Sequence, residues 1–183
     1  MRKLLRRMIQ AALLDADTYE EVEADHQSVF QATLVVGLAS ISFGLGTAIQ
    51  STNAGITGVQ LALQVAISAL LPPVFWFGGS AFAFMTGASF FRGPETETDF
   101  AEVLRTTGFA FTPGLLLVFS CLPPATLGLG IYFLTSLWIV IAGVVAIRQA
   151  LDFTTVRAVG TFGSAMVLLW LMVWGLSVVP LPL

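Results

Sequence analysis

The stretch HQSVFQATLVVGLASISFGLGTAIQSTNAGITGVQLALQVAISALLPPVFWFGGSAFAFMTGASFF, His26–Phe91, runs for 66 residues without an Asp, Glu, Lys or Arg. About 20 apolar residues in a helix cross a bilayer, because roughly 30 Å of hydrocarbon is covered at 1.5 Å per residue. This stretch therefore has room for two membrane passes. Further uncharged runs of 42 residues (106–147) and 26 residues (158–183) fit two passes and one pass. The pattern predicts an all-α membrane helix bundle with five transmembrane helices.

The distribution of charge divides the chain into two expected parts. Residues 1–27 are predicted to form a cytoplasmic helical segment, and residues 28–183 are predicted to form the transmembrane domain. The expected spans are, in chain order, 28–49, 61–86, 106–122, 128–147 and 160–179. A six-pass alternative arises if residues 54–91 hold two short spans broken at Pro72 and Pro73.

The charged residues also predict the orientation of the chain. All eight Lys and Arg lie in three stretches, Arg2–Asp25, Arg92–Arg105 and Arg148–Arg157. Five passes place all three stretches on one side, and Lys and Arg collect on the cytoplasmic side of membrane proteins. We therefore expect a cytoplasmic N-terminus and a C-terminus outside. Six passes would place the last two stretches on the outer face, which this tendency disfavours. In a prokaryote the membrane would be the cytoplasmic (inner) membrane.

Composition limits the possible functions. Charged residues make up 10% of the chain and the mean hydropathy is +0.88, whereas about a quarter of residues are charged in soluble domains. A net charge of −3 argues against a nucleic-acid partner. Catalysis inside a membrane needs ionisable or metal-binding groups at depth, and the predicted spans contain no Asp, Glu, Lys, Arg or His. We therefore expect no enzyme activity, no cofactor and no metal site.

The N-terminus predicts an amphipathic helix. Apolar residues recur there at helical spacing beside four cations: Leu4, Leu5, Met8, Ile9, Ala12 and Leu13 beside Arg2, Lys3, Arg6 and Arg7. One interpretation is a helix in the headgroup region held by anionic lipid. The other is a solvated helix packed on the rest of the protein. Thr18 and Glu21 form a capping-box pattern that predicts the start of a second helix, and Asp99 with Glu102 predicts another.

Two sets of residues are candidates for contacts. The first consists of polar side chains in the charged stretches that could meet a cytoplasmic partner: Tyr19, Glu20, Glu21, Glu23, Asp25, Arg92, Glu95, Arg105, Arg148 and Asp152. The second consists of small residues at every fourth position, which allow close helix packing in lipid, and of prolines, which can kink a helix. Its members are Gly44, Pro72, Pro73, Gly79, Ala83, Pro113, Ala142 and Ala146. The packing residues could serve the bundle itself, a homo-oligomer or a partner protein.

Several stretches in order resemble the Yip family of five-pass membrane proteins. They are TYEEVEAD (Thr18–Asp25), GFAFTPGLL (Gly108–Leu116), the pair Pro123-Pro124, Trp138, and the triplet from Ala146 to Arg148. The resemblance implies five passes, a cytosolic N-terminus and an outside C-terminus. Eukaryotic members bind Rab GTPases, but no residue here can be matched to that role. The short N-terminal segment favours a bacterial or archaeal branch, for which the resemblance implies no established activity.

These observations leave two functional hypotheses. The first is a non-enzymatic integral membrane protein with a membrane-organising, trafficking-like or scaffold role through its cytoplasmic loops and helix faces. The alternative is a small channel, transporter or lipid-handling protein that uses the helices containing Pro72, Pro73 and Pro113. An intramembrane enzyme is a weaker third hypothesis, because no acid, base and nucleophile occur together in the sequence.

Overall fold

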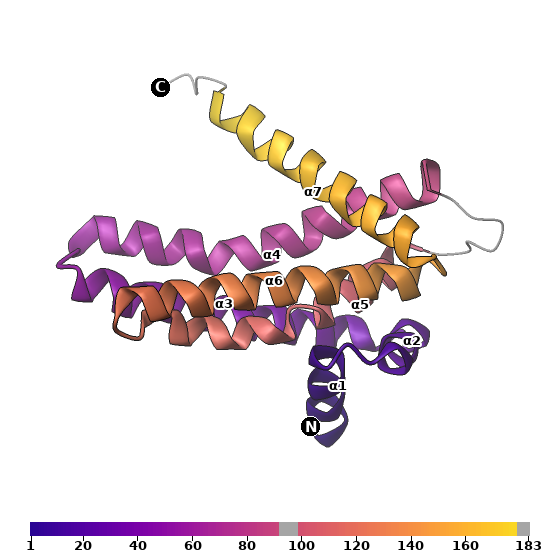
Figure 1. The fold of residues 1–183 in the computed structure, drawn as a ribbon, viewed down its shortest axis with the longest axis horizontal. Helices are drawn as coiled ribbons and strands as arrows, with labels where there is room; N and C mark the ends of the chain where they lie inside the picture. Colours follow the sequence, from indigo (N-terminus) through magenta and orange to yellow (C-terminus); the bar gives the residue numbers. More distant parts are fainter. Residues whose placement is uncertain (92–98, 179–183) are drawn as a thin grey trace.

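A computed structural model describes residues 1–91 and 99–178 of the chain (Figure 1). In these ranges every element of regular structure is a helix and no strand occurs, which confirms the predicted all-α class. The helices are, in chain order, α1 (Arg2–Ala12), α2 (Ala16–Ala24), α3 (Ser28–Asn53), α4 (Gly58–Ser89), α5 (Phe100–Phe109), the 3₁₀ helix η1 (Thr112–Cys121), α6 (Ala125–Ala150) and α7 (Thr155–Val178).

Among the described residues, four helices are long and apolar enough to cross a membrane: α3, α4, α6 and α7. Helix α4 is one element of 32 residues that contains Pro72 and Pro73 without interruption. The six-pass alternative, which needed a break there, is therefore wrong. Membrane helices tolerate proline because neighbouring groups satisfy the backbone bonds that it frees.

The third predicted span, 106–122, forms as two pieces rather than one helix. Helix α5 begins earlier, at Phe100, behind a capping box in which the Asp99 carboxylate accepts from the Glu102 amide at 2.8 Å. It meets η1 at a bend of 42°, and together they are a fifth candidate span. A 3₁₀ helix rises about 2.0 Å per residue, against about 1.5 Å in an α-helix. Ten residues in each form therefore cover roughly 35 Å of chain, comparable to the hydrocarbon thickness.

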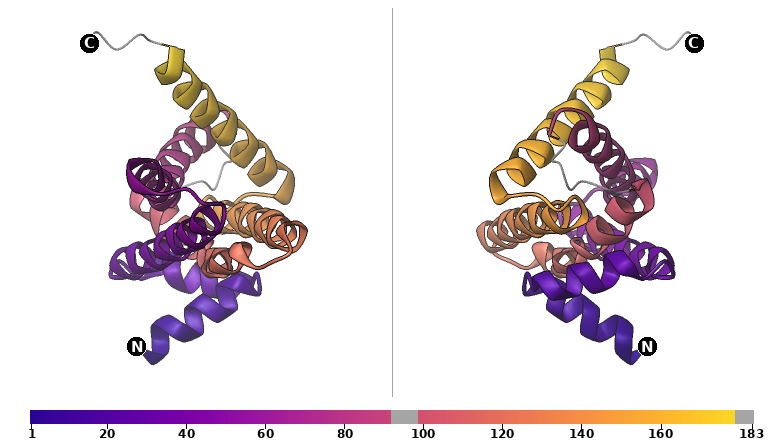
Figure 2. Two further views of the ribbon diagram at one scale, coloured as in Figure 1. Left: turned by 90° about the vertical axis from the view of Figure 1, so that its left-hand side faces the viewer. Right: turned by 90° about the vertical axis from the view of Figure 1, so that its right-hand side faces the viewer.

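Helix α3 packs along both η1 and α4 and also contacts α5. The views along the bundle show α7 crossing the other long helices at an angle (Figure 2). Glycines allow the closest approaches. A Cβ on Gly46 would lie 2.6 Å from the Leu117 carbonyl oxygen, and one on Gly108 would lie 2.6 Å from Ala32 Cβ. Close backbone contact of this kind is the main way in which helices gain packing energy in lipid.

The N-terminal helices α1 and α2 lie across the side of the bundle near one end (Figure 1). Helix α2 begins at Ala16, so the start predicted at Thr18 is wrong. The Thr18 hydroxyl instead donates to the Asp15 carboxylate at 2.6 Å. Helix α2 contacts α5 and α6, and we call this end of the bundle the charged end. The α3–α4 loop and the η1–α6 turn lie at the opposite end (Figure 1).

Candidate functional site

The charged end carries a cap made of α1 and α2, and the cap is anchored by buried side chains. Tyr19 and Val22 of α2 are fully buried. The Tyr19 hydroxyl donates to the Ala11 carbonyl at 3.1 Å, and burial raises the pKa of this phenol above its ordinary value. Sequence reasoning placed Tyr19 among the contact residues, but its side chain lies inside the cap, where it joins α1 to α2.

Arg7 is the centre of the cap. Its side chain is fully buried, and its guanidinium donates to Glu21 at 3.0 Å, to Asp25 at 2.9 Å and to Gln31 of α3 at 3.0 Å. One cation therefore joins α1, α2 and α3. The hydrogen bonds from Arg7 and Lys3 lower the pKa of Asp25 to about 2. Burial raises the pKa of Glu21, but the hydrogen bond and charge of Arg7, together with the charges of Arg6 and Lys3, outweigh it, so that the pKa is lowered overall.

Arg105 fastens the cap to the membrane domain. This side chain of α5 is buried, donates to the Glu23 carbonyl oxygen at the end of α2, and lies 3.8 Å from the Glu102 carboxylate. A second attachment comes from α6, where the Gln149 amide donates to Glu20 at 2.7 Å. Sequence reasoning could not find the contacts of Arg105 with Glu23 and of Gln149 with Glu20, because they join residues more than 80 positions apart.

Acidic residues gather around Arg105. Burial and the negative charges of Asp152, Glu102 and Glu20 raise the pKa of Glu23 to about 7, although Arg105 opposes the shift. The structure thus brings the predicted contact residues Glu20, Glu23, Arg105 and Asp152 into one region. Arg148 is exposed at the end of α6, and Arg92 and Glu95 lie outside the described residues.

The candidate packing residues lie between helices of the bundle. Ala83, Ala142 and Ala146 are fully buried. Gly44 faces Ala69 of α4, where an added Cβ would lie 3.3 Å from Ala69 Cβ, and Gly79 faces Met166 of α7. Pro72 is buried within α4, and Pro113 is buried in the first turn of η1; Pro73 is half-buried. The structure therefore places these positions at contacts inside the bundle, and a role in a homo-oligomer or a partner interface stays a prediction.

Helix α1 has two apolar faces. The inner face, with Met8 and Ala11, is buried against the protein. The outer face carries Leu5, Ile9 and Leu13, which are 59%, 54% and 71% exposed. Of the four neighbouring cations, three are occupied within the cap, because Lys3, Arg6 and Arg7 pair with Glu21 or Asp25. The lipid and packing interpretations of this helix thus refer to different faces.

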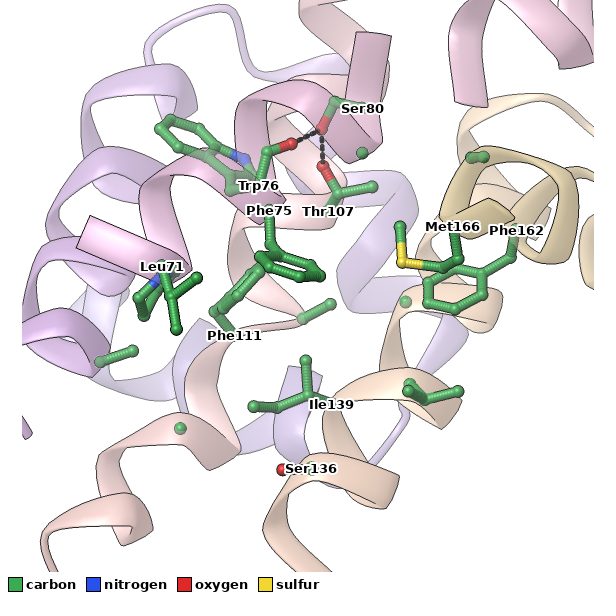
Figure 3. A pocket seen from close by; sticks show the side chains of 18 of the residues that line it. Leu71, Phe75, Trp76, Ser80, Thr107, Phe111, Ser136, Ile139, Phe162 and Met166 are labelled. Atoms are coloured by element: carbon green, nitrogen blue, oxygen red, sulfur yellow. Dashed lines mark hydrogen bonds between the residues drawn. The ribbon is translucent and has the colours of Figure 1, made fainter. Parts of the chain in front are cut away.

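A pocket of about 390 Å³ lies among α3, α4, α6, α7 and the α5–η1 segment (Figure 3). Figure 3 shows Phe75 and Phe111 close together in it, with Met166 and Phe162 on another side. Ser80 and Thr107 form its polar corner, with their hydroxyl oxygens 2.7 Å apart. Sequence reasoning missed this pocket, because its lining comes from separate helices and consists mostly of ordinary apolar residues. Among the described residues, no His, Cys, Asp or Glu cluster could hold a metal ion.

The charged cap on several long apolar helices defines a multi-pass integral membrane protein whose helices contact the bilayer. Comparison with models of protein families identifies the family within this class. The model of the Yip1 domain matches residues 13–177, and the chain therefore belongs to the Yip1 domain family. The match begins near the end of α1 and includes the rest of the helices. No curated protein and no solved structure matches the chain.

Proposed function

We propose that this protein is a non-enzymatic membrane-organising protein of the Yip type that docks another protein on its cap. The observation that carries the proposal is the attachment of α2 to the membrane domain from two sides, by Arg105 to the Glu23 carbonyl and by Gln149 to Glu20. A helix held in this way presents its outward side chains in a fixed arrangement. Such preorganisation reduces the entropy that binding would otherwise cost.

The outward face of α2 is acidic. Asp17, Glu20 and Asp152 are exposed on α2 and just after α6. A partner with a basic surface would be steered toward this face, because complementary charge speeds encounter and selects against like-charged proteins. The proposed partner is therefore a cytosolic protein, or the cytosolic part of a membrane protein, with clustered Lys or Arg.

The proposal includes the orientation of the chain. All eight Lys and Arg belong to α1, to residues 92–105 or to residues 148–157, and the positive-inside tendency assigns these segments to the cytoplasm. With five passes the C-terminus then lies outside. The outer face of α1, with Leu5, Ile9 and Leu13, would rest among lipid headgroups. Arg2 at its edge would meet anionic lipid.

Co-purification of partner proteins in mild detergent tests the docking proposal. The wild-type chain and the double variant Asp17→Asn/Asp152→Asn are purified in mild detergent, and the proteins that co-purify with each are compared by mass spectrometry. A partner should bind the wild type and be lost from the double variant. The matched control is Arg157→Gln, which removes an exposed charge at the same end of the bundle but outside α2. A chain recovered only with copies of itself would contradict the proposal.

A second candidate function is that of a small channel, transporter or lipid-handling protein. Among the transport and lipid-handling hypotheses, the apolar walls of the pocket favour lipid handling. A lipid-scrambling assay on purified protein in liposomes tests this candidate. Movement of labelled lipid no faster than in protein-free liposomes would remove it.

A further inference from the structure

We propose that the pocket between α3, α4, α6, α7 and η1 binds one acyl chain of a bilayer lipid. Its volume of about 390 Å³ falls within the range of roughly 300–1,000 Å³ found for small-molecule sites. Its lining comes from the middle of membrane-crossing helices, including Trp76 of α4 and Ile139 of α6. The inference stands apart from the proposed function, because chain binding is measurable whether or not lipid is moved.

The chemistry of the walls selects hydrocarbon over a polar ligand. No charged residue lines the pocket among the described residues. The Ser80 and Thr107 hydroxyl oxygens lie 2.7 Å apart, and each also lies 2.6 Å from a carbonyl oxygen of its own helix, that of Trp76 or Val103. The two hydroxyl hydrogens are shared among these three contacts. The Trp76 indole donates to the Leu104 carbonyl at 2.9 Å. These polar groups are satisfied by the protein, so they require no ligand.

The pocket is continuous with the surface that faces the bilayer. Leu71, Phe75, Tyr132 and Val140 line it, yet they are 38%, 41%, 41% and 42% exposed. They belong to α4 and α6, which are long and apolar enough to cross a membrane, so an opening of the pocket beside these side chains would face hydrocarbon. A lipid chain can therefore reach the pocket sideways without leaving the hydrocarbon layer.

Other contents are less favourable than an acyl chain. Water does not fill cavities with apolar walls, because it finds too few hydrogen-bond partners there. An empty pocket would leave the facing rings of Phe75 and Phe111 without dispersion contacts on one side. The surrounding bilayer supplies hydrocarbon at very high local concentration, so a lipid chain is the occupant that the site selects.

Photolabelling of the full chain tests this site. The protein is placed in phosphatidylcholine vesicles that contain phosphatidylcholine with a diazirine in the middle of one acyl chain, then illuminated, digested and mapped by mass spectrometry. Trp76 and Ser80 are 9% and 1% exposed, so label there requires a chain inside the pocket. Phe133, which is 65% exposed on α6, provides the reference for ordinary lipid contact.

A matched pair of variants completes the experiment. Ser136→Phe places a ring in the pocket, whereas Leu137→Phe adds a ring at the next residue, which is outside the lining and 45% exposed. Label at Trp76 and Ser80 relative to Phe133 should fall about tenfold or more in Ser136→Phe, because the added ring removes the volume that the chain needs. It should be unchanged in Leu137→Phe. Should Ser136→Phe fail to fold, Ile139→Phe fills the same pocket.

Two outcomes would overturn the inference. The first is wild-type protein with label at Phe133 but none at Trp76 or Ser80. The second is equal pocket label in Ser136→Phe and Leu137→Phe. If pocket label is absent and chemical cross-linking in the same vesicles yields a dimer, a second copy of the chain occupies the pocket instead of lipid.

Discussion

At the scale of single residues, Arg6 and Arg7 show how neighbouring cations can have different roles. Arg7 is fully buried and binds Glu21, Asp25 and Gln31, whereas Arg6 is 55% exposed and pairs with Glu21 alone. A buried charge that loses its partners is costly, while an exposed ion pair contributes little, because water screens it. The stability of the cap should therefore depend on Arg7 far more than on Arg6.

We predict that Arg7→Met lowers the free energy of local unfolding of α2 by about 2 kcal/mol. This is less than the roughly 3–5 kcal/mol expected for breaking a fully buried ion pair, because Glu21 and Asp25 keep some contact with water. Arg6→Met should change the stability of α2 by less than about 1 kcal/mol. The measurement is hydrogen exchange of the amides of Thr18 to Val22 in lipid nanodiscs. Equal loss of protection in both variants would contradict the central role of Arg7.

Glu23 gives the cap a dependence on pH. Its pKa is raised from 4.5 to about 7, so the folded cap favours the neutral acid. Neutral Glu23 therefore stabilises the folded cap relative to ionised Glu23. This stabilisation is fully present below about pH 4.5 and is lost as the pH rises through 7. Glu23→Gln removes the ionised state. At pH 8 it should stabilise the attachment of α2 by about 1–2 kcal/mol, after discounting for the solvent that screens the half-exposed side chain.

The same variant should have little effect near pH 4, where Glu23 already carries its proton. Hydrogen exchange of α2 at both pH values measures the difference. Asp17→Asn, at an exposed carboxylate of the same helix, is the control. A gain for Glu23→Gln that is equal at pH 4 and pH 8 would show that ionisation of Glu23 is not its cause.

At the scale of elements, the packing of α3 against η1 depends on where its glycines fall. A Cβ on Gly46 would lie 2.6 Å from the backbone oxygen of Leu117, whereas a Cβ on Gly37 meets nothing within 4 Å. Gly46→Ala should therefore cost about 1–3 kcal/mol through overpacking. Gly37→Ala should gain up to about 1 kcal/mol from higher helix propensity. Unfolding by SDS in mixed micelles compares the two, and a similar midpoint for both would argue against close contact between these elements.

The two faces of α1 lead to a further prediction. If the outer face meets lipid, an environment-sensitive fluorophore attached at Ile9→Cys should emit at shorter wavelength in vesicles than one at Asp17→Cys. Both variants are made in a Cys121→Ala background, which removes the cysteine of the native sequence. Because Lys3, Arg6 and Arg7 pair within the cap, anionic lipid should strengthen this contact only weakly. Equal emission at the two sites would place α1 in water.

At the scale of the whole molecule, five passes make a prediction about access from each side. Single cysteines at Asp17 and Thr154 should react with an impermeant reagent from one side of the membrane. Cysteines at Asn53 and Thr126 should react from the other side. All four positions are exposed. Thr126 decides whether the bent pair α5–η1 crosses the bilayer, because it follows that pair directly. Labelling of Thr126 from the side of Asp17 would show that the bent pair does not cross, and would reduce the number of passes to four.

Much of the architecture could be predicted from single stretches of sequence. The capping box of Asp99 and Glu102 is local, since both residues lie within one helical turn. The long uncharged runs predicted membrane helices, because ionised groups are costly in hydrocarbon wherever the helices pack. The break in the third span was not predictable in this way. The sequence of an apolar segment such as Thr112–Cys121 is compatible with both an α-helix and a 3₁₀ helix. In the structure this segment is a 3₁₀ helix that contacts α3 and α6.

The sequence by itself determined that this chain is a helical membrane protein, because charge and hydropathy are properties of each segment alone. The match to the Yip1 domain over residues 13–177 is likewise a property of the sequence. Only the tertiary structure decided which apolar residues face protein and which face lipid. Lipid and a protein interior are similarly apolar, so hydropathy cannot separate Ala39, fully buried beside the pocket, from Leu38, which is 42% exposed. The burial of Arg7 and Arg105 likewise depended on partners from other helices, and the pocket exists only where five separate segments meet.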